Sequence, residues 1–300
     1  MKYAGKDIVL YDGPKGSMFF AKGYKGCADI YNIEAYEDTK DIIRKYANAG
    51  SEWIQTNTFN SNGFALGSRG YGDRQRDIIS NSIRSANEVA DEMLAKNGRR
   101  PEVIFITGPT GRMVEPYGDT TEQEAYDSFY EEFKIASECG IYNAHIETFM
   151  DLNEMTVAIR AASAIREELA KKGIHYKIIC TMAFESHGRT MFGNSPEDCY
   201  EVFKEYGVDA FGANCGCTAK DMLKVIEGYS AAAGPDAMII AKPNAGKPIT
   251  QGDKVTYAET PEMFAHDCLA LLDAGAKIIG GCCGTSDLHI AALKDLLENS

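Results

Sequence analysis

Short apolar runs alternate with amphipathic stretches along the whole chain. Several amphipathic stretches end in a glycine, and an apolar run follows within a few residues, as at Gly50, Gly140 and Gly173. Glycine favours the position after a helix because it enters the left-handed region without the steric penalty of a Cβ atom. The pattern therefore predicts helices that stop at a glycine and lead into buried strands.

Counting these units gives eight strands and eight helices in strict alternation. The strands are expected near 8–11, 53–58, 103–107, 143–149, 177–183, 210–214, 238–242 and 277–280. The helices are expected at 38–49, 74–95, 121–139, 152–171, 196–206, 220–232, 261–274 and 288–297. Near-continuous apolar strands are typical of parallel strands buried on both faces. Ser195 before Pro196 and Thr260 before Pro261 are N-cap signals.

The alternation predicts an α/β protein that forms a single-domain (β/α)8 TIM barrel over residues 1–300. A doubly wound open sheet is the alternative. That fold usually carries a G-x-G-x-x-G turn after its first strand, and none follows the strand near 8–11. No Pro/Ser-rich linker divides the chain, so one domain is expected.

Composition narrows the classes of function and setting. The 300 residues carry a net charge of -13, which argues against nucleic acid or an anionic membrane surface as the main partner. No apolar run reaches the ~18 residues of a membrane span, and no signal-peptide core follows Met1. The nine cysteines are odd in number and irregularly spaced. They argue against a disulfide framework and favour a reducing cytoplasm.

Cysteines gather where a barrel would place its chemistry. Active sites of such barrels lie at the C-terminal ends of the strands, and four cysteines follow strands 6 and 8. Those two strand ends lie roughly 10 Å apart at strand spacings of ~4.8 Å, and thiolates favour zinc. Buried small hydrophobes or a strained vicinal disulfide are the alternatives. The four are Cys215, Cys217, Cys282 and Cys283.

Glycines and the remaining cysteines complete this interpretation. Gly280, Gly281 and Gly284 would let the backbone bend enough for neighbouring sulfurs to reach one ion. The other cysteines fall in a loop, in helices or in the middle of a strand, and are expected to be structural. They are Cys27, Cys139, Cys180, Cys199 and Cys268.

The motif at 280–285, GGCCGT, resembles the signature of the homocysteine S-methyltransferase family. The sequence GANC at 212–215 resembles that family's G-x-N-C motif. The likeness is closest to the N-terminal, homocysteine-binding module of cobalamin-dependent methionine synthase, and it runs along the chain. Further segments in family order are 12–18, 56–59, 108–111, 147–148, 188–190 and 243–246.

The resemblance implies zinc-dependent methyl transfer to the thiol of homocysteine, which gives methionine. It assigns Cys215, Cys282 and Cys283 as the three Zn²⁺ ligands, while Cys217 falls outside the motif and is treated as a neighbour. Three protein ligands leave one open position for a substrate sulfur. The bound sulfur would lose its proton, and the thiolate is the nucleophile.

The resemblance also implies a set of substrate contacts. Asp12 and Glu147 match carboxylates near the homocysteine amino group. The backbone around Gly13 and Ser17 would approach the substrate carboxylate, and Asn214 would border the site.

Some residues depart from the family pattern. Pro14 and Lys15 replace a small and an apolar residue in the opening motif. The single tryptophan, Trp53, lies early in strand 2, where core packing is expected rather than a cation–π box for a betaine donor. His187 lies in a loop, either in contact with substrate or in solvent.

No residues remain in the predicted barrel for a cobalamin or folate module. The segment 287–292 nearly matches the cobalamin motif D-x-H-x-x-G, but it lacks the glycine. Asp287 is expected to cap the last helix, and His289 to lie in its first turn. A separate methyl-corrinoid protein is therefore the expected donor, with S-methylmethionine or another small sulfonium or ammonium donor as the alternative. Methyl transfer to a different thiol, or a non-catalytic corrinoid-binding or thiol-sensing role, also stays open.

Overall fold

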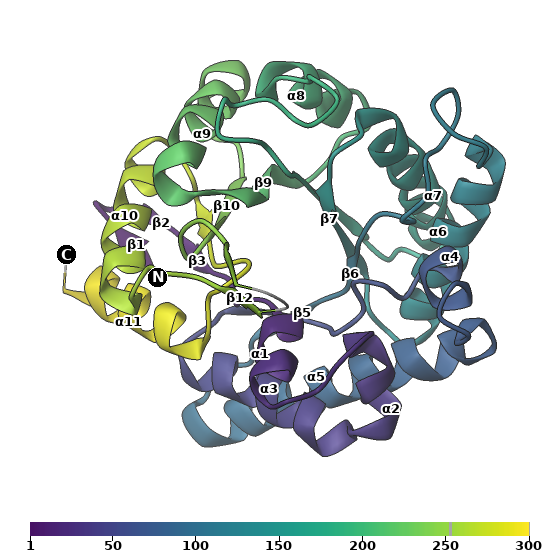
Figure 1. Ribbon diagram of the computed structural model, residues 1–300, viewed down its shortest axis with the longest axis horizontal. Helices are drawn as coiled ribbons and strands as arrows, with labels where there is room; N and C mark the ends of the chain where they lie inside the picture. Colours follow the sequence, from purple (N-terminus) through teal and green to yellow (C-terminus); the bar gives the residue numbers. More distant parts are fainter. Residues whose placement is uncertain (252–253, 300) are drawn as a thin grey trace.

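The protein, described here by a computed structural model for residues 1–251 and 254–299, is a ring of parallel strands surrounded by helices (Figure 1). The strands of the ring follow one another in chain order, as predicted. They are β3 (Val9–Leu10), β4 (Trp53–Gln55), β5 and β6 (Glu102–Ile104 and Ile106–Thr107), β7 (Asn143–Phe149), β8 (Lys177–Met182), β9 (Ala210–Thr218), β10 (Ile239–Asn244) and β13 (Ile278–Ile279).

Hydrogen bonds close the ring on both sides of β4. Seven strands form one parallel sheet in the order β3-β13-β10-β9-β8-β7-β6, and β4 pairs in parallel with β5. Only Phe105 separates β5 from β6, so these two strands form one continuous edge. On the other side of β4, Tyr11 bridges Trp53, and the Glu52 N–H donates to the Leu10 carbonyl at 2.7 Å. The predicted eight-stranded α/β barrel is therefore confirmed.

Eight long helices cover the outside of the ring. Their bounds lie within two residues or so of the predicted ones. They are α3 (Tyr36–Asn48), α5 (Gln75–Asn97), α6 (Glu122–Glu138), α7 (Leu152–Ala170), α8 (Pro196–Glu205), α9 (Ala219–Ala233), α10 (Pro261–Asp273) and α11 (Asp287–Glu298).

The predicted helix caps are confirmed at two positions and wrong at one. The side chains of Ser195 and Thr260 accept hydrogen bonds from the first turns of α8 and α10. Asp287 is not the cap of α11. Ser286, one residue earlier, takes the capping position with an extended backbone, and the His289 ring accepts a hydrogen bond from its N–H. His289 therefore lies in the first turn, as predicted.

Short elements in the loops were not predicted, because two to seven residues are too few to establish a period. Strand β9 also continues to Thr218, beyond its predicted end at 214. The short elements are β1 (Lys2–Tyr3), β2 (Lys6–Asp7), α1 (Lys15–Ala21), η1 (Ala28–Ile30), α2 (Tyr31–Glu34), α4 (Gly63–Gly67), η2 (Gly72–Arg74), β11 (Ile249–Gln251) and β12 (Lys254–Thr256).

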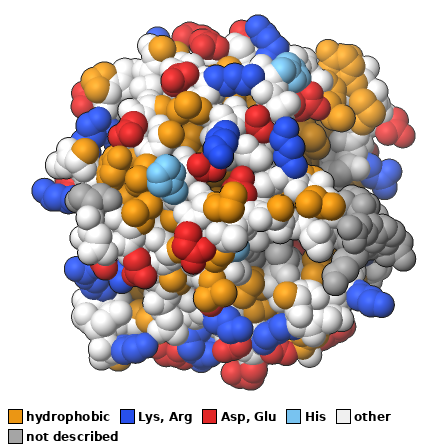
Figure 2. Space-filling view, turned by 60° about the vertical axis from the view of Figure 1, so that its left-hand side comes forward, with side chains coloured by type: hydrophobic (Ala, Val, Ile, Leu, Met, Phe, Trp, Pro, Cys, Tyr) orange, Lys and Arg blue, Asp and Glu red, His pale blue; other side chains and the backbone are white. Residues whose placement is uncertain are grey.

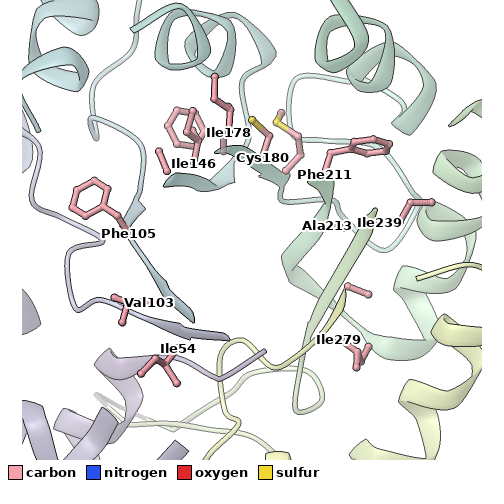
Figure 3. Close-up of a cluster of buried hydrophobic side chains, with 14 of the residues drawn as sticks. Ile54, Val103, Phe105, Ile146, Ile178, Cys180, Phe211, Ala213, Ile239 and Ile279 are labelled. Carbon is pink, nitrogen blue, oxygen red and sulfur yellow. The ribbon is translucent and has the colours of Figure 1, made fainter. Parts of the chain in front are cut away.

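Strand side chains alternate between two separate apolar regions. Figure 3 shows outward-facing residues such as Ile54, Val103 and Ile178, which pack between the strands and the helices. Inward-facing residues, including Ile104 and Ile240, form a smaller cluster inside the barrel. The alternation follows from the two-residue period of a strand. The residues that face the barrel interior are therefore a different set from those that pack against the helices.

The residues expected to be structural lie in these apolar regions. Trp53 packs edge-on against Tyr11 inside the barrel, with ring centroids 5.4 Å apart. All nine cysteines are free thiols. Four of the five cysteines expected to be structural are buried, and Cys139 is half-buried.

The surface mixes both signs of charge. Figure 2 shows basic and acidic side chains interspersed over the flank that carries α10 and α11. Within residues 1–251 and 254–299, no helix has the length and apolarity needed to cross a bilayer.

Candidate active site

Three cysteine sulfurs meet at the C-terminal end of the barrel, which we call the mouth. Cys215 lies in β9, and Cys282 and Cys283 lie in the loop after β13. Their Sγ atoms all lie within 4.8 Å of one another, and those of Cys215 and Cys283 are 3.8 Å apart. Tetrahedral zinc with Zn–S bonds of ~2.3 Å requires sulfurs about 3.8 Å apart. This three-cysteine cluster therefore fits a zinc ion and leaves its fourth position for another ligand.

Unusual backbone geometry brings the sulfurs together. Cys215 has a φ of 58°, in the left-handed region that residues with a Cβ atom rarely adopt. Gly216 follows with a φ of 72°, and a Cβ atom there would lie 2.3 Å from the Phe184 carbonyl oxygen. On the other loop, the Cys282 N–H donates to the Pro243 carbonyl at 2.9 Å, which fixes this loop to the end of β10.

The glycines around the cysteine pair have two different roles. Gly284 has a φ of 82° and makes the left-handed bend that the sequence predicted. Gly280 and Gly281 lie outside that region, so they supply space rather than a bend. A Cβ atom on Gly280 would lie 2.8 Å from the backbone oxygens of Tyr11 and Asp12, and glycine therefore allows β13 to approach β3.

Each sulfur of the cluster has its own side-chain hydrogen-bond partner. Asn214 donates to Cys282 at 3.7 Å, Asn244 bonds Cys215, and the Tyr257 hydroxyl bonds Cys283. Such partners orient metal ligands and adjust their charge. The sequence analysis included Asn214 but not the other two. Asn244 stands in a segment already matched to the family, whereas nothing in the sequence marks Tyr257.

The thiols of the cluster differ in pKa. Hydrogen bonds from Cys282 and Cys283 lower the pKa of Cys215, and the hydrogen bond to Cys215 raises the pKa of Cys282. One thiolate among three close sulfurs is thus favoured, whereas three thiolates would repel one another. A divalent cation at the centre is what would allow all three to ionise together.

Two other candidates do not join the cluster. Cys217 is buried, and burial raises the pKa of its thiol to about 12. Its sulfur is not among the three that meet at the mouth, and its role as a neighbour stays a prediction. His187 is exposed and lies 3.4 Å from Glu185, so it is in solvent at the edge of a separate cleft.

A cavity of about 340 Å³ opens beside the cluster. Two of the predicted substrate residues, Ser17 and Glu147, line it together with the three cysteines. Asp12, Gly13 and Asn214 lie behind this lining. The other residues of the wall are Pro14, Lys15, Gly16, Phe20, Ala28, Asp29, Gln55, Asn57, Phe59, Asn60, Ile106 and Thr148.

Two lysines accompany the predicted carboxylates. Lys15 forms an ion pair with Asp12 and also donates to the Gly13 carbonyl at 3.3 Å. Lys242, on the inner face of β10, lies 3.2 Å from a Glu147 oxygen. Burial raises the pKa of Asp12 and lowers that of Lys15, while their mutual attraction opposes both shifts.

A chain of hydrogen bonds leads from the barrel interior to the cluster. The Tyr11 hydroxyl and His145 Nδ1 are 2.9 Å apart, as are His145 Nε2 and the Thr181 hydroxyl. Thr181 donates to Asn214 at 2.7 Å, and Asn214 donates to Cys282. Burial holds the pKa of His145 well below its usual value, so the ring is neutral and its approach to Glu147 is not an ion pair.

The sequence profile of the homocysteine S-methyltransferase family matches residues 9–297. The chain belongs to this family. Methionine synthase from Mycobacterium tuberculosis is 26% identical over 301 residues, which covers 97% of this chain and 25% of that protein. Methionine synthase from Mycobacterium leprae is 27% identical over 270 residues, covering 90% and 22%. The chain thus spans about a quarter of the length of these curated relatives.

A solved structure supports the fold of this homocysteine S-methyltransferase family member. The homocysteine methyltransferase MmuM from Escherichia coli, in its metallated form, superposes with a TM-score of 0.80 at 19% identity. The match covers 97% of this chain and 96% of that one. At this identity the likeness concerns the barrel alone.

The family motifs converge on one place in space. The GGCCGT and G-x-N-C segments are more than 60 residues apart in sequence, and they meet at the mouth because β9 and β13 flank β10. The opening motif reaches the same cavity through Ser17. Lys15 departs from the family's opening motif, and Lys242 lies just before the matched segment 243–246.

Proposed function

We propose that this chain is a zinc-dependent methyltransferase that moves a methyl group to the thiolate of homocysteine and gives methionine. The observation that carries the proposal is the three-cysteine cluster, whose sulfur spacing suits tetrahedral zinc and which borders a cavity. Cys215, Cys282 and Cys283 would hold the ion. Bound Zn²⁺ would lower the pKa of an acceptor thiol at its open position, so that the thiol reacts as a thiolate.

The residues around the cluster keep the sulfurs in place. Hydrogen bonds from Asn214, Asn244 and Tyr257 reduce the negative charge that each cysteine carries. Because Asn214 is also held by Thr181 and Thr148, its amide cannot rotate away from Cys282. The arrangement fixes the direction from which an acceptor sulfur approaches.

The cavity would hold the remainder of homocysteine. Ser17 and Glu147 line it, and their positions support the roles that the family resemblance implies. Gly13 and Asp12 lie directly behind Lys15, and Asn214 borders the site through Thr148. In the transfer, a thiolate lone pair forms the S–CH3 bond. The bond between the methyl carbon and its donor breaks, and its electron pair stays with the donor.

The donor in this proposal is a separate methyl-corrinoid protein that docks on the mouth. Exposed apolar side chains on several loops at this end support a protein partner. The rings of Tyr117 and Phe192, from two different loops, lie 5.6 Å apart, and the two residues are 58% and 40% exposed. The other exposed apolar residues on these loops are Phe20, Met113, Met150, Met191 and Ile249. A small sulfonium donor such as S-methylmethionine would leave this surface without a partner.

Nine free thiols also suit a reducing compartment, and we infer the cytoplasm. A three-thiolate metal site needs its cysteines reduced, and so this setting follows from the same proposal.

A donor–acceptor matrix tests the function. Purified protein is supplied with methylcobalamin, a methyl-corrinoid protein or S-methylmethionine, and with homocysteine or another thiol, while methionine and zinc are measured. We expect about one zinc per chain and methionine formation that a chelator stops. Cys282→Ala should lose both zinc and activity, whereas Cys217→Ala should keep both. A zinc-free active protein, or binding of donors with no methyl transfer to any thiol, would overturn the proposal.

A further inference from the structure

The hydrogen bonds that lead from the barrel interior to the three-cysteine cluster all point the same way. Their direction is fixed at Asn214, whose Oδ1 accepts from the Thr148 backbone N–H at 2.9 Å. A backbone N–H can only donate, so this contact determines which end of the amide is the oxygen. The Asn214 NH2 group therefore faces the Thr148 hydroxyl at 2.6 Å and the Cys282 sulfur at 3.7 Å.

The proton positions on Thr181 and His145 follow from that orientation. The Thr181 hydroxyl has one proton and lies 2.7 Å from Asn214 Oδ1, which can only accept, so the proton lies there. Thr181 must then accept from His145 Nε2, which is 2.9 Å away. Burial holds the pKa of His145 well below its usual value, so the ring is neutral and carries one N–H. Its Nδ1 therefore accepts from the Tyr11 hydroxyl at 2.9 Å.

These four side chains, which we call the hydrogen-bond relay, are shielded from solvent. Tyr11, His145, Thr181 and Asn214 are each 0% exposed. In an interior of low dielectric constant, hydrogen bonds that point the same way polarise one another. Each donation therefore strengthens the next, and the last N–H directs a larger partial positive charge at the Cys282 sulfur than an isolated amide would.

The relay begins beside a carboxylate that lines the cavity, yet His145 does not hold that carboxylate. His145 Nδ1 lies 3.6 Å from a Glu147 oxygen, and Lys242 Nζ lies 3.2 Å from the same oxygen. Because Nδ1 carries no proton, it cannot donate to Glu147. Lys242 is the donor there, and it also lies 4.0 Å from the centre of the Tyr11 ring. The single N–H of His145 is directed to the metal end of the relay.

We propose that His145 is a positioning residue of the metal centre: with its proton on Nε2 it directs the Thr181 hydroxyl to Asn214, and through Asn214 it adjusts the negative charge on the Cys282 sulfur. This inference rests on the metal centre of the proposed function. A stronger N–H donor withdraws charge from a thiolate ligand. The bound metal then draws more charge from an acceptor sulfur at the open position, which favours the ionised acceptor.

The position of the His145 proton is measured first, in metal-free protein. Long-range proton–nitrogen correlation NMR distinguishes a protonated ring nitrogen from an unprotonated one, and the signals of His145 are those lost in His145→Gln. We expect a neutral ring with its proton on Nε2. A proton on Nδ1 instead, or a charged ring at neutral pH, overturns the inference.

The effect on the sulfur is measured with zinc and with cobalt(II) as a coloured probe metal. His145→Leu removes both hydrogen bonds of the ring. We expect it to move the sulfur-to-cobalt charge-transfer band to longer wavelength, because a thiolate with a weaker donor releases electrons more readily. Zinc should bind about 3- to 10-fold more weakly. His145→Gln can still donate to Thr181 from its amide and should retain most of both properties.

A double-mutant cycle with Thr181→Val shows whether His145 acts through the relay. Thr181→Val removes the hydroxyl between His145 and Asn214 and keeps the shape of the side chain. In that background His145→Leu should have no further effect on the cobalt band or on zinc affinity. Thr107→Val, at an equally buried threonine whose hydroxyl bonds Glu132, is the matched control and should change neither. Additive losses would give His145 a purely structural role and overturn the inference.

The outcomes separate this inference from the proposed function, because none of these measurements depends on methyl transfer. An unchanged cobalt band and zinc affinity in His145→Leu overturn the inference while the proposed function stands. A protein that binds neither metal overturns both. The expected shifts in a protein that methylates no thiol overturn the proposed function alone.

Discussion

At the scale of single residues, the polar groups inside the barrel have defined partners. Asn214 links the barrel interior to the three-cysteine cluster, because it accepts a hydrogen bond from Thr181 and donates one to Cys282. Tyr257 reaches the cluster from a distant loop and lies against Gly284. These contacts fix the charge and direction of the sulfurs, so small changes to them should alter metal affinity without unfolding the protein.

Tyr257→Phe tests this directly. The change removes the hydroxyl that bonds Cys283 and keeps the ring that packs on Gly284. We expect zinc affinity to fall about 10-fold, with little change in stability, in competition with a chromophoric chelator. Tyr130→Phe loses a hydroxyl bonded to Glu168 on the outer helices and should leave zinc affinity unchanged. Equal affinity for both variants would show that the Tyr257 hydroxyl does not act on the metal site.

Glu132 should make stability depend on pH. It is buried, Thr107 is the one hydrogen-bond partner of its carboxyl group among residues 1–251 and 254–299, and burial raises its pKa well above the usual value. The unfolded chain releases this proton first, so the free energy of unfolding should fall as pH rises from ~4.3 toward the folded pKa, by up to ~1.4 kcal/mol per pH unit. Glu132→Gln should remove this part of the slope in urea unfolding from pH 5 to 8. An unchanged slope would mean that Glu132 ionises inside the protein.

The sequence pointed to the three cysteines that meet at the mouth, which we propose as metal ligands, but to only part of the cavity. Cys282 and Cys283 stand in a distinctive glycine-bracketed motif, whereas Lys242 belongs to an ordinary strand. Alternation offered a signal for it, since Lys242 lies two residues after the inward-facing Ile240. Tyr257 could not have been found, because a long loop brings it to the cluster and no local pattern encodes that path.

At the scale of elements, the backbone at the end of β9 determines where the Cys215 side chain lies. The strand continues through Cys215 and Gly216, both with positive φ, to Thr218. Thr148, at the end of β7, also has a positive φ of 67°, and it bonds Asn214. Two such non-glycine residues beside one cluster indicate strain that the surrounding contacts maintain.

Gly216→Ala should damage the site more than the backbone angle alone explains. Gly173, after α7, has nearly the same φ, 73° against 72°, but has open space around it. Gly173→Ala should cost about 1 kcal/mol of unfolding free energy and keep zinc. Gly216→Ala should cost about 3 kcal/mol or more and weaken zinc binding, because its new Cβ meets the Phe184 carbonyl. Similar losses in the two variants, measured by urea unfolding and metal analysis, would contradict this account.

The elements differ in how far sequence could predict them. The long helices and the strands of the ring were predicted because several turns or a full apolar run carry a clear period. Helix α1 was missed, since Lys15–Ala21 contains only seven residues. The end of β9 was placed too early, because Cys215, Gly216 and Cys217 resemble a loop in sequence. The first two have positive φ, and strand pairing resumes only where Thr218 pairs with Asn244.

At the scale of the whole molecule, the mouth collects segments from every part of the chain. Cys215 and Cys283 belong to opposite sides of β10, and a bound ion would join them. The barrel therefore brings together residues that lie far apart in the sequence, and metal binding should strengthen it as a unit.

Zinc removal should lower thermal stability. An ion held by the folded chain alone stabilises it by about 2.7 kcal/mol at 100 times its dissociation constant, which corresponds to a melting temperature about 5 °C higher or more. Scanning calorimetry with and without a chelator measures the difference. Cys282→Ala should melt at the same temperature in both conditions, and a chelator effect on that variant would place the metal elsewhere.

The apolar residues of the mouth should distinguish a protein donor from a small one. Tyr117→Ser with Phe192→Ser removes the exposed ring pair. We expect methyl transfer from a corrinoid protein to fall about 10-fold or more, while free methylcobalamin is used equally well. Leu94→Ser, exposed at the opposite end of the barrel, is the control. Unchanged transfer from the protein donor would remove the support for docking at these rings.

The two-sided strands have a practical consequence for engineering. Side chains at outward positions such as Ala241 pack in the core between the strands and the helices. Those at inward positions such as Lys242 face the barrel interior, where Lys242 bonds Glu147 beside the cavity. Under the proposed function, a library limited to positions 15, 55 and 242 should change which thiols the cavity accepts while the helix packing is kept. If the proposed methyl transfer is found in the donor–acceptor matrix, the chain offers a starting point for selecting methyltransferases for other thiols, with specificity and folding varied separately.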